Sequence, residues 1–164
     1  MIYTRPLTAD SFAPYGDVLA LKDHADKIIN QGKCGRHHDL AKLDIIAGDS
    51  LSGKVGISLF QSELRSFPYQ LDMMERHPLG SQAFIPMSMD GFLVIVAPDD
   101  GGKPALPEAF ITEAGQGINF HRNIWHGVLT PISGTGLFAV IDRIGVEANL
   151  EEYWFEKPYI VSKV

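Results

Sequence analysis

The fold is decided by the stretch Glu75-Arg76-His77-Pro78-Leu79-Gly80-Ser81-Gln82-Ala83-Phe84-Ile85-Pro86-Met87. Glu75 and His77 are two residues apart, so on a β-strand their side chains lie on the same face. The Pro and Gly that follow predict a turn, after which Gln82 returns to the same side of the sheet. The spacing therefore gathers a carboxylate, an imidazole and an amide on one inner wall.

A second stretch complements the first, and it reads Gly117-Ile118-Asn119-Phe120-His121-Arg122-Asn123-Ile124-Trp125-His126. We expect a tight turn over residues 121–123, because Asn tolerates a positive φ angle better than most residues. That turn would bring His126 onto the inner wall. His121, just before the turn, could reach the same cavity.

These side chains suit two kinds of chemistry. Carboxylate, imidazole and amide groups are ligands for a divalent ion such as Mn, Fe, Ni or Zn, which predicts a metal site at His77, Gln82 and His126. The same groups could also bind and protonate a small polar substrate without a metal. We therefore take Glu75, His77, His121 and His126 as candidate catalytic residues.

The hydrophobic pattern predicts one all-β domain over residues 1–164 with a short N-terminal helix. Thr8 is a candidate N-cap for a helix over residues 8–13. Residues 22–35 are polar and rich in glycine, which predicts a loop, and the tail from 147 to 164 has a mixed pattern. Short strands separated by Gly and Pro turns favour a sandwich or barrel. The expected strands are 17–21, 55–61, 67–74, 91–97, 109–112, 125–132 and 137–144.

Composition excludes several classes of function. The net charge is −6 and no dense run of Lys or Arg occurs, so non-specific nucleic-acid binding is not expected. No apolar run approaches the roughly 20 residues that span a bilayer. The N-terminus lacks the features of a signal peptide, which predicts a cytoplasmic protein. Cys34 is the only cysteine, so no internal disulfide can form.

The two stretches resemble the paired motifs of the cupin superfamily. His77 and His126 match the motif histidines directly. Glu75 stands where the first motif has another His, Gln82 stands at its Glu, and Asn123 replaces a Gly in the second motif. The resemblance implies a cupin-like β-barrel, the double-stranded β-helix or jelly roll.

The longer strings resemble the ureidoglycolate lyase family more specifically. Further matching segments are Arg36-x-His38-Asp39-Leu40, Ile141-Asp142-Arg143 and the opening pattern from Leu7 to Val18. The resemblance implies a homodimer of small barrels that cleaves (S)-ureidoglycolate to glyoxylate and urea, late in allantoin and purine breakdown. It also implies a divalent metal, with nickel as the first choice.

The residues fit this reaction, which needs a base, an acid and a positive group for the substrate carboxylate. Arg36 and Arg76 are the candidate carboxylate-binding residues, with Arg122 and Arg143 as further candidates, although Arg76 and Arg122 would point outward on ideal strands.

Other functions remain open from the sequence. They are another metal-dependent cupin enzyme acting on a small oxygenated acid, a non-catalytic sensor of such an acid, and a hydrolase that also releases ammonia. A second subunit is expected to cover the outer face of the apolar strand at 91–97.

Overall fold

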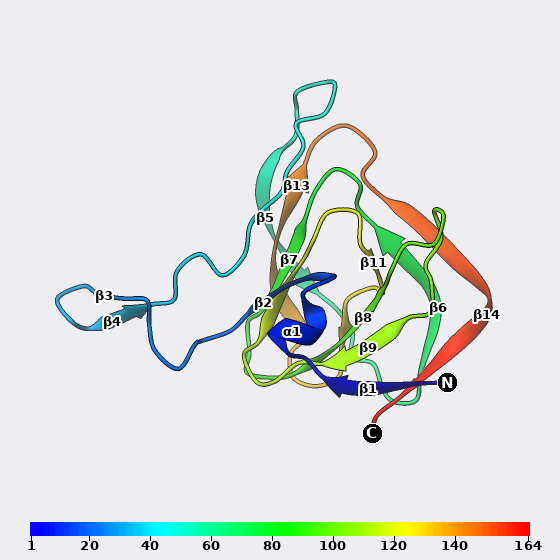
Figure 1. Cartoon of the computed structure of the whole chain (residues 1–164), viewed down its shortest axis with the longest axis horizontal. Coiled ribbons are helices and arrows are strands. Elements are labelled where there is room, and N and C mark those ends of the chain that lie inside the picture. Colours follow the sequence, from blue (N-terminus) through cyan, green and yellow to red (C-terminus); the bar gives the residue numbers. More distant parts are fainter.

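Two β-sheets face each other across an aromatic core in the computed structural model, which describes all 164 residues (Figure 1). The elements are β1 (Ile2–Pro6), α1 (Ala9–Phe12), β2 (Gly16–Leu19), β3 (Lys27–Ile29), β4 (Cys34–Arg36), β5 (Lys54–Gln61), β6 (Tyr69–Arg76), β7 (Gln82–Pro86), β8 (Phe92–Ala97), β9 (Glu108–Ile111), β10 (Gly117–Phe120), β11 (Trp125–His126), β12 (Thr130–Pro131), β13 (Leu137–Ile144) and β14 (Glu151–Ser162).

The larger sheet closes on itself. Its strand order is β11-β6-β14-β1-β9-β8-β12, and β11 also pairs with β8. It is a mixed sheet, because β1 runs parallel to both of its neighbours, β14 and β9. The second sheet has the order β2-β10-β7-β13-β5 and is antiparallel throughout. This architecture confirms the predicted all-β, cupin-like barrel.

Strand β8 separates two hydrophobic cores. All six of its residues are buried, which confirms the prediction of a strand buried on both faces. Alternate residues, beginning with Phe92, face the core shared with the five-stranded sheet, and the others, beginning with Leu93, face a second core. Leu71 of β6 and Val161 of β14 help to cover that second face. The cover therefore comes from the same chain, and the expected need for a second subunit at β8 was wrong.

The helix α1 forms as predicted. The Thr8 side chain accepts a hydrogen bond from the Ser11 amide at 3.2 Å and completes a capping box. Phe12, at the end of the helix, is fully buried in the aromatic core. This four-residue element is the only helix, and no helix of the chain is long and apolar enough to cross a membrane.

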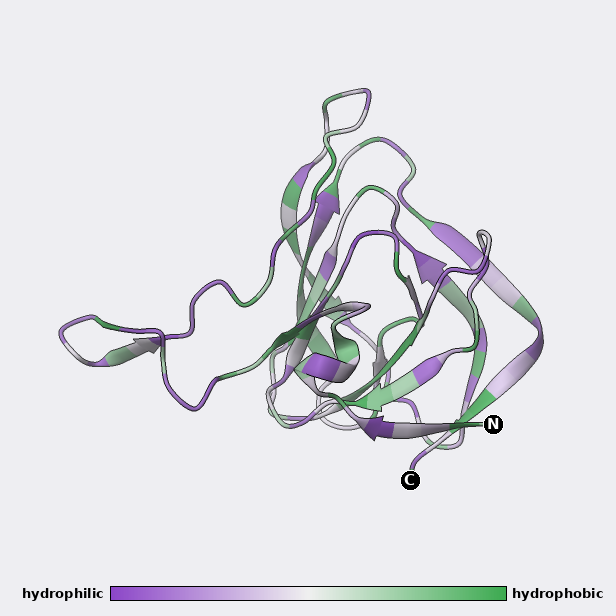
Figure 2. Ribbon diagram, in the orientation of Figure 1, coloured by the Kyte–Doolittle hydropathy of each residue, from purple (hydrophilic) through white to green (hydrophobic).

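The structure departs from the prediction in several segments, one of which is residues 2–6, where the unpredicted strand β1 forms. Residues 125–132 form two short strands instead of one, and residues 22–35 contain most of the β3–β4 hairpin. This hairpin stands clear of the barrel and is largely hydrophilic (Figure 2). The mixed tail forms the 12-residue strand β14, which pairs with β6 despite its four charged residues, because backbone pairing in a sheet overrides local preference.

Candidate active site

The two sequence stretches meet where β6 and β11 pair. Glu75 and His126 are directly opposite each other in the antiparallel register, so their side chains lie on the same face. The turn after β10 is tied to the first stretch, because the Asn123 amide donates a hydrogen bond to the His77 carbonyl at 3.0 Å. Asn123 has a φ of 67°, as the sequence predicts. Pairing and turn together bring both histidines to one carboxylate.

Glu75, His77 and His126 form a compact triad. One ligand atom from each residue lies within 4.8 Å of the other two. Glu75 Oε1 is 3.9 Å from His77 Nε2 and 4.0 Å from His126 Nδ1. The imidazole ring centres are 5.2 Å apart. These three residues are three of the four sequence-predicted catalytic residues.

Backbone carbonyls fix the tautomer of each histidine. His77 Nδ1 lies 2.7 Å from the Asn149 carbonyl, and His126 Nδ1 lies 3.0 Å from the Gly127 carbonyl. A carbonyl can only accept, so each Nδ1 carries a proton, and the neutral form of either ring keeps its lone pair on Nε2. Both Nε2 atoms are buried and have no hydrogen-bond partner. The Phe120 ring stacks on His126 at 4.2 Å and holds its plane.

The donor set fits a metal ion. A ring whose Nδ1–H is held by a backbone carbonyl and whose Nε2 has no protein partner is the usual arrangement of a metal-binding histidine, and His77 and His126 both have it. The carboxylate of Glu75 adds an oxygen donor within the same 4.8 Å group. The triad could therefore hold a metal ion.

Burial shifts the pKa values of two triad residues, Glu75 and His126, in opposite directions. Desolvation raises the pKa of Glu75, partly offset by the neighbouring His77 and reinforced by Glu152. Desolvation, together with the proximity of His77, lowers the pKa of His126 to about 3. The site therefore combines a carboxyl group whose proton is held unusually well with an imidazole that stays neutral.

Gln82 enters the same wall from β7. It is the register partner of Phe120, so the two side chains share the inner face of the five-stranded sheet. Its Nε2 donates to Asp142 Oδ2 at 3.1 Å, while its Oε1 is buried without a partner. The carboxylate of Asp142 thus fixes the amide so that the carbonyl oxygen is left to accept a hydrogen bond or bind a cation.

His121 lies outside the triad. It follows the inward-facing Phe120 by one residue, and its Nε2 lies 3.2 Å from Asp17 Oδ1 in an exposed position. The structure therefore brings three of the predicted catalytic residues together and leaves the fourth on the surface.

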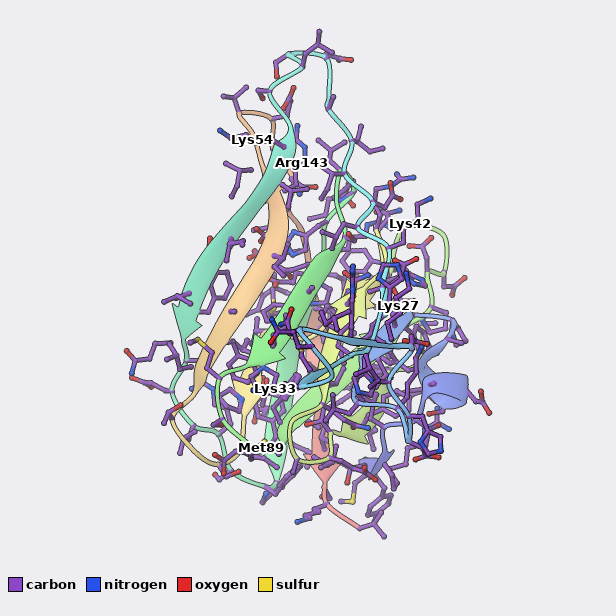
Figure 3. The ribbon with its side chains drawn as sticks, turned by 90° about the vertical axis from the view of Figure 1, so that its left-hand side faces the viewer. Lys27, Lys33, Lys42, Lys54, Met89 and Arg143 are labelled. Carbon is purple, nitrogen blue, oxygen red and sulfur yellow. The ribbon has the colours of Figure 1, made fainter.

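The predicted carboxylate-binding arginines also lie elsewhere. Arg76 pairs with Asp99 and Glu151 and stacks over the Trp125 ring, on the strand face opposite Glu75, as the alternation predicts. Arg36 lies on the projecting β3–β4 hairpin. The two further candidates are held in other contacts. Arg122 pairs with Asp44, and Arg143, labelled in Figure 3, is buried and pairs with Glu147.

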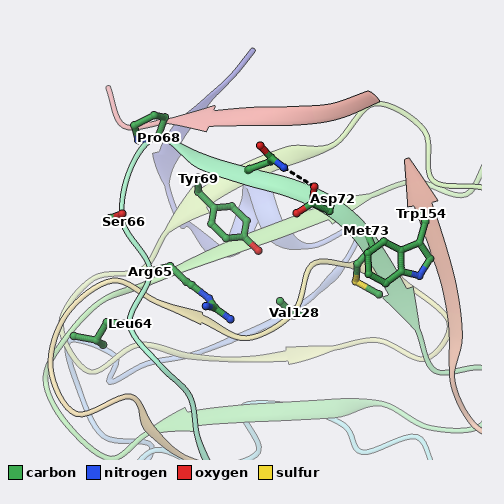
Figure 4. Close-up of a pocket in the computed structure, with 10 residues that line it drawn as sticks. Leu64, Arg65, Ser66, Pro68, Tyr69, Asp72, Met73, Val128 and Trp154 are labelled. Carbon is green, nitrogen blue, oxygen red and sulfur yellow. Dashed lines mark hydrogen bonds between the residues drawn. The ribbon is translucent and has the colours of Figure 1, made fainter. Parts of the chain in front are cut away.

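Two open cavities share part of their walls, and one of them includes a triad residue. One, of about 520 Å³, has Glu75 and Arg65 in its wall. The other, of about 560 Å³, shares Arg65 and Val128 with the first (Figure 4). Substrate-sized space therefore reaches Glu75 from the side of the β5–β6 connection.

Sequence reasoning missed two residues of this region. Asn149 orients His77 and also accepts a hydrogen bond from the Leu79 amide at 2.6 Å, which fixes the turn between β6 and β7. Arg65 lines the cavity. Asn149 lies in the tail and Arg65 in a connection, where no periodic pattern marks a buried or inward-facing side chain.

Comparison with known proteins places this geometry in a family. The family model described as ureidoglycolate lyase matches residues 1–162. Ureidoglycolate lyase from Rhodobacter capsulatus is 53% identical over 157 residues, covering 96% of this chain and 95% of the relative. Ureidoglycolate lyase 2 from Rhizobium meliloti is 51% identical over 158 residues, with the same coverage of both chains. With its triad, barrel and nearly full-length similarity, the chain belongs to the ureidoglycolate lyase family.

Proposed function

We propose that this enzyme cleaves (S)-ureidoglycolate to glyoxylate and urea, a late step of allantoin and purine breakdown. The proposal is carried by one observation, the compact Glu75–His77–His126 triad, whose carboxyl residue Glu75 lines an open cavity of about 520 Å³. The printed names of the relatives, ureidoglycolate lyase, support the choice of substrate.

Glu75 is the proton-transfer group in this proposal. Its carboxylate takes the proton from the substrate hydroxyl, the C–O bond becomes a carbonyl, and the C–N bond breaks with its electrons going to nitrogen. The same proton then passes to the departing urea nitrogen. The raised pKa of Glu75 suits this role, because it makes the carboxylate a stronger base toward the substrate hydroxyl than an exposed glutamate would be.

His77 and His126 flank Glu75 in the same step. His126 stays unprotonated because of its lowered pKa of about 3, so its free nitrogen accepts a hydrogen bond or binds a cation and does not act as an acid. His77, held by the Asn149 carbonyl, presents the same kind of nitrogen beside Glu75. The Gln82 carbonyl oxygen is placed to accept from an N–H group of the ureido moiety.

A divalent ion fits the same donor set, and nickel is the first to test. Glu75, His77 and His126 would hold it, with the Gln82 oxygen as a further donor. When bound, such an ion supplies Lewis-acid polarisation that lowers the pKa of the substrate hydroxyl.

We also propose a homodimer that uses the free edge of the five-stranded sheet. On the outward face of β5, Ile57 and Leu59 are 75% and 64% exposed, and Met87 beyond β7 is 53% exposed. Strand β5 has no neighbour on its other side. Contiguous apolar surface beside an unpaired edge is typical of a protein–protein contact.

The test is product analysis with purified protein and racemic ureidoglycolate. We expect equimolar urea and glyoxylate, consumption of half of the racemate, and no ammonia. Release of ammonia in step with glyoxylate would replace the lyase by a hydrolase, and absence of any product at all would remove the proposed substrate.

A further inference from the structure

The substrate carboxylate requires a cation, and most arginines of the chain are already paired. Arg5 contacts Glu108, and Arg76, Arg122 and Arg143 each form an ion pair with an acidic side chain. Breaking such a pair to bind a ligand would cost the energy of the existing contact. The guanidinium groups of Arg36 and Arg65 make no hydrogen bond or ion pair with another residue.

Only Arg65 of these two lies in a cavity wall that also contains a triad residue. The cavity of about 520 Å³ is bounded by the end of β5, by the segment after it and by the β11–β12 connection. Its lining residues are Phe60, Gln61, Ser62, Arg65, Glu75, Val128 and Leu129. Its volume is within the roughly 300–1,000 Å³ usual for small-molecule sites. The Arg65 guanidinium and the Glu75 carboxyl group therefore belong to the wall of one cavity that a small ligand could occupy.

The backbone of Arg65 is held in place. Its amide donates to the Pro131 carbonyl at 2.8 Å, and the Ser62 amide donates to the Gly136 carbonyl at 2.9 Å. Two hydrogen bonds thus tie the β5–β6 connection to β12 and to the start of β13. Figure 4 shows the Arg65 side chain pointing toward Val128, which borders both cavities. The Arg65 side chain therefore extends into the cavity wall from a backbone segment that two hydrogen bonds hold in place.

We propose that Arg65 is the substrate-binding residue that anchors the carboxylate of ureidoglycolate, an inference that rests on the proposed function. An arginine binds a carboxylate through two parallel N–H···O bonds, which fixes the orientation of the ligand as well as its position. With the carboxylate end held at Arg65, the carbinolamide end of the substrate extends toward Glu75. Arg65 therefore replaces Arg36 and Arg76 as our choice for this role.

Kinetics of Arg65→Gln, with Lys33→Gln as the control, test the assignment. Lys33→Gln also removes one exposed positive charge, but on the projecting hairpin. We expect KM for ureidoglycolate to rise about 10- to 100-fold in Arg65→Gln, with kcat changed much less, and neither to change in the control. Arg65→Lys should recover part of the affinity, since it restores the charge but not the two-pronged geometry.

Binding of the product glyoxylate, measured by calorimetry, separates this proposal from the proposed reaction. Weaker glyoxylate binding in Arg65→Gln than in the wild type supports the carboxylate anchor, even if the wild type turned over a different acid. Unchanged KM together with unchanged glyoxylate affinity would overturn it, as would an equal loss in Lys33→Gln. Failure of the wild type to bind glyoxylate also counts against the anchor.

Discussion

Glu75 and His126 respond to the same burial in opposite ways. Their side chains lie 4.0 Å apart, yet desolvation raises the pKa of the carboxyl group and lowers that of the imidazole to about 3. Both shifts have one physical cause, since a low-dielectric site disfavours whichever form is charged. Burial therefore favours the uncharged form of both side chains.

The acid limb of the pH–rate profile should report Glu75. The reaction needs the carboxylate form, so kcat/KM should fall as pH drops through the raised pKa, above the ordinary value of 4.5. Glu75→Gln should lower kcat by about 10²–10⁴-fold. An unchanged profile in a Glu75 variant that keeps its activity would remove the carboxyl group from the proton-transfer step.

The same shift predicts a stability change. Because the folded-state pKa of Glu75 is raised, its stabilising contribution is present below pH 4.5 and is lost as pH rises through the folded-state value. Glu75→Gln should therefore be at least as stable as the wild type at pH 7, with the advantage disappearing at acid pH. Thermal denaturation at the two pH values checks this, and a loss of stability at pH 7 would contradict it.

His126→Ala should abolish urea release and also destabilise the fold. The imidazole is fully buried and stacks on Phe120, so its removal leaves a cavity that costs about 2–4 kcal/mol. His126→Phe preserves the stacking volume and should regain most of the stability without regaining activity. Chemical denaturation and product assays on both variants separate the two effects, and activity in either variant would exclude His126 from the site.

The amount of bound metal should depend on the triad residues and not on His121. We expect about one divalent ion per chain after loading with nickel, measured by elemental analysis. The ion should be lost in His77→Gln and retained in His121→Gln, because His121 lies on the surface beside Asp17. Equal metal content in both variants would mean that the ion, if bound, sits elsewhere.

Asp142 should affect the reaction only by orienting the Gln82 amide. Asp142→Ala removes the acceptor that orients the Gln82 amide, and we expect kcat/KM to fall about tenfold, since a hydrogen bond to a charged group contributes about 1.5–3 kcal/mol. Asp142→Asn keeps an acceptor and should lose less. A double variant with Gln82→Ala should be no worse than Gln82→Ala alone. Additive losses would mean that Asp142 acts independently.

The free edge of β5 should control assembly. Ile57→Glu introduces a charge into the exposed apolar face and should convert a dimer into a monomer with its fold intact. Leu21→Glu changes an equally exposed leucine far along the chain and should leave the dimer unchanged. Light scattering at micromolar concentration gives the mass of each, and a monomeric wild type would rule out the dimer.

The sequence predicts the triad because local rules determine it. Alternation along a strand places Glu75 and His77 together, and the positive φ of Asn123 allows the turn that brings His126 back. These are short-range properties of the chain. The same rules explain why Arg76 points away from the site.

Long-range contacts set the rest, and a single sequence does not reveal them. Whether Asp142 meets Gln82 depends on the register between β13 and β7. Asn149 acts on His77 from 72 residues away, out of a tail with no clear periodicity. Arg65 acquires its position from a hydrogen bond to β12. Each of these depends on pairing between distant segments, which intrinsic preferences do not encode.

Strand β14 also sets the order in which the molecule can mature. It lies between β6, which carries Glu75, and β1, whose Ile2 is paired with Val161. Strand β1, which is synthesised first, therefore cannot pair with β14 until the end of the chain has been made. The larger sheet cannot close before that point. Catalytic competence should appear only after release, so that a chain stalled before residue 149 carries the triad but lacks the Asn149 carbonyl that orients its histidine.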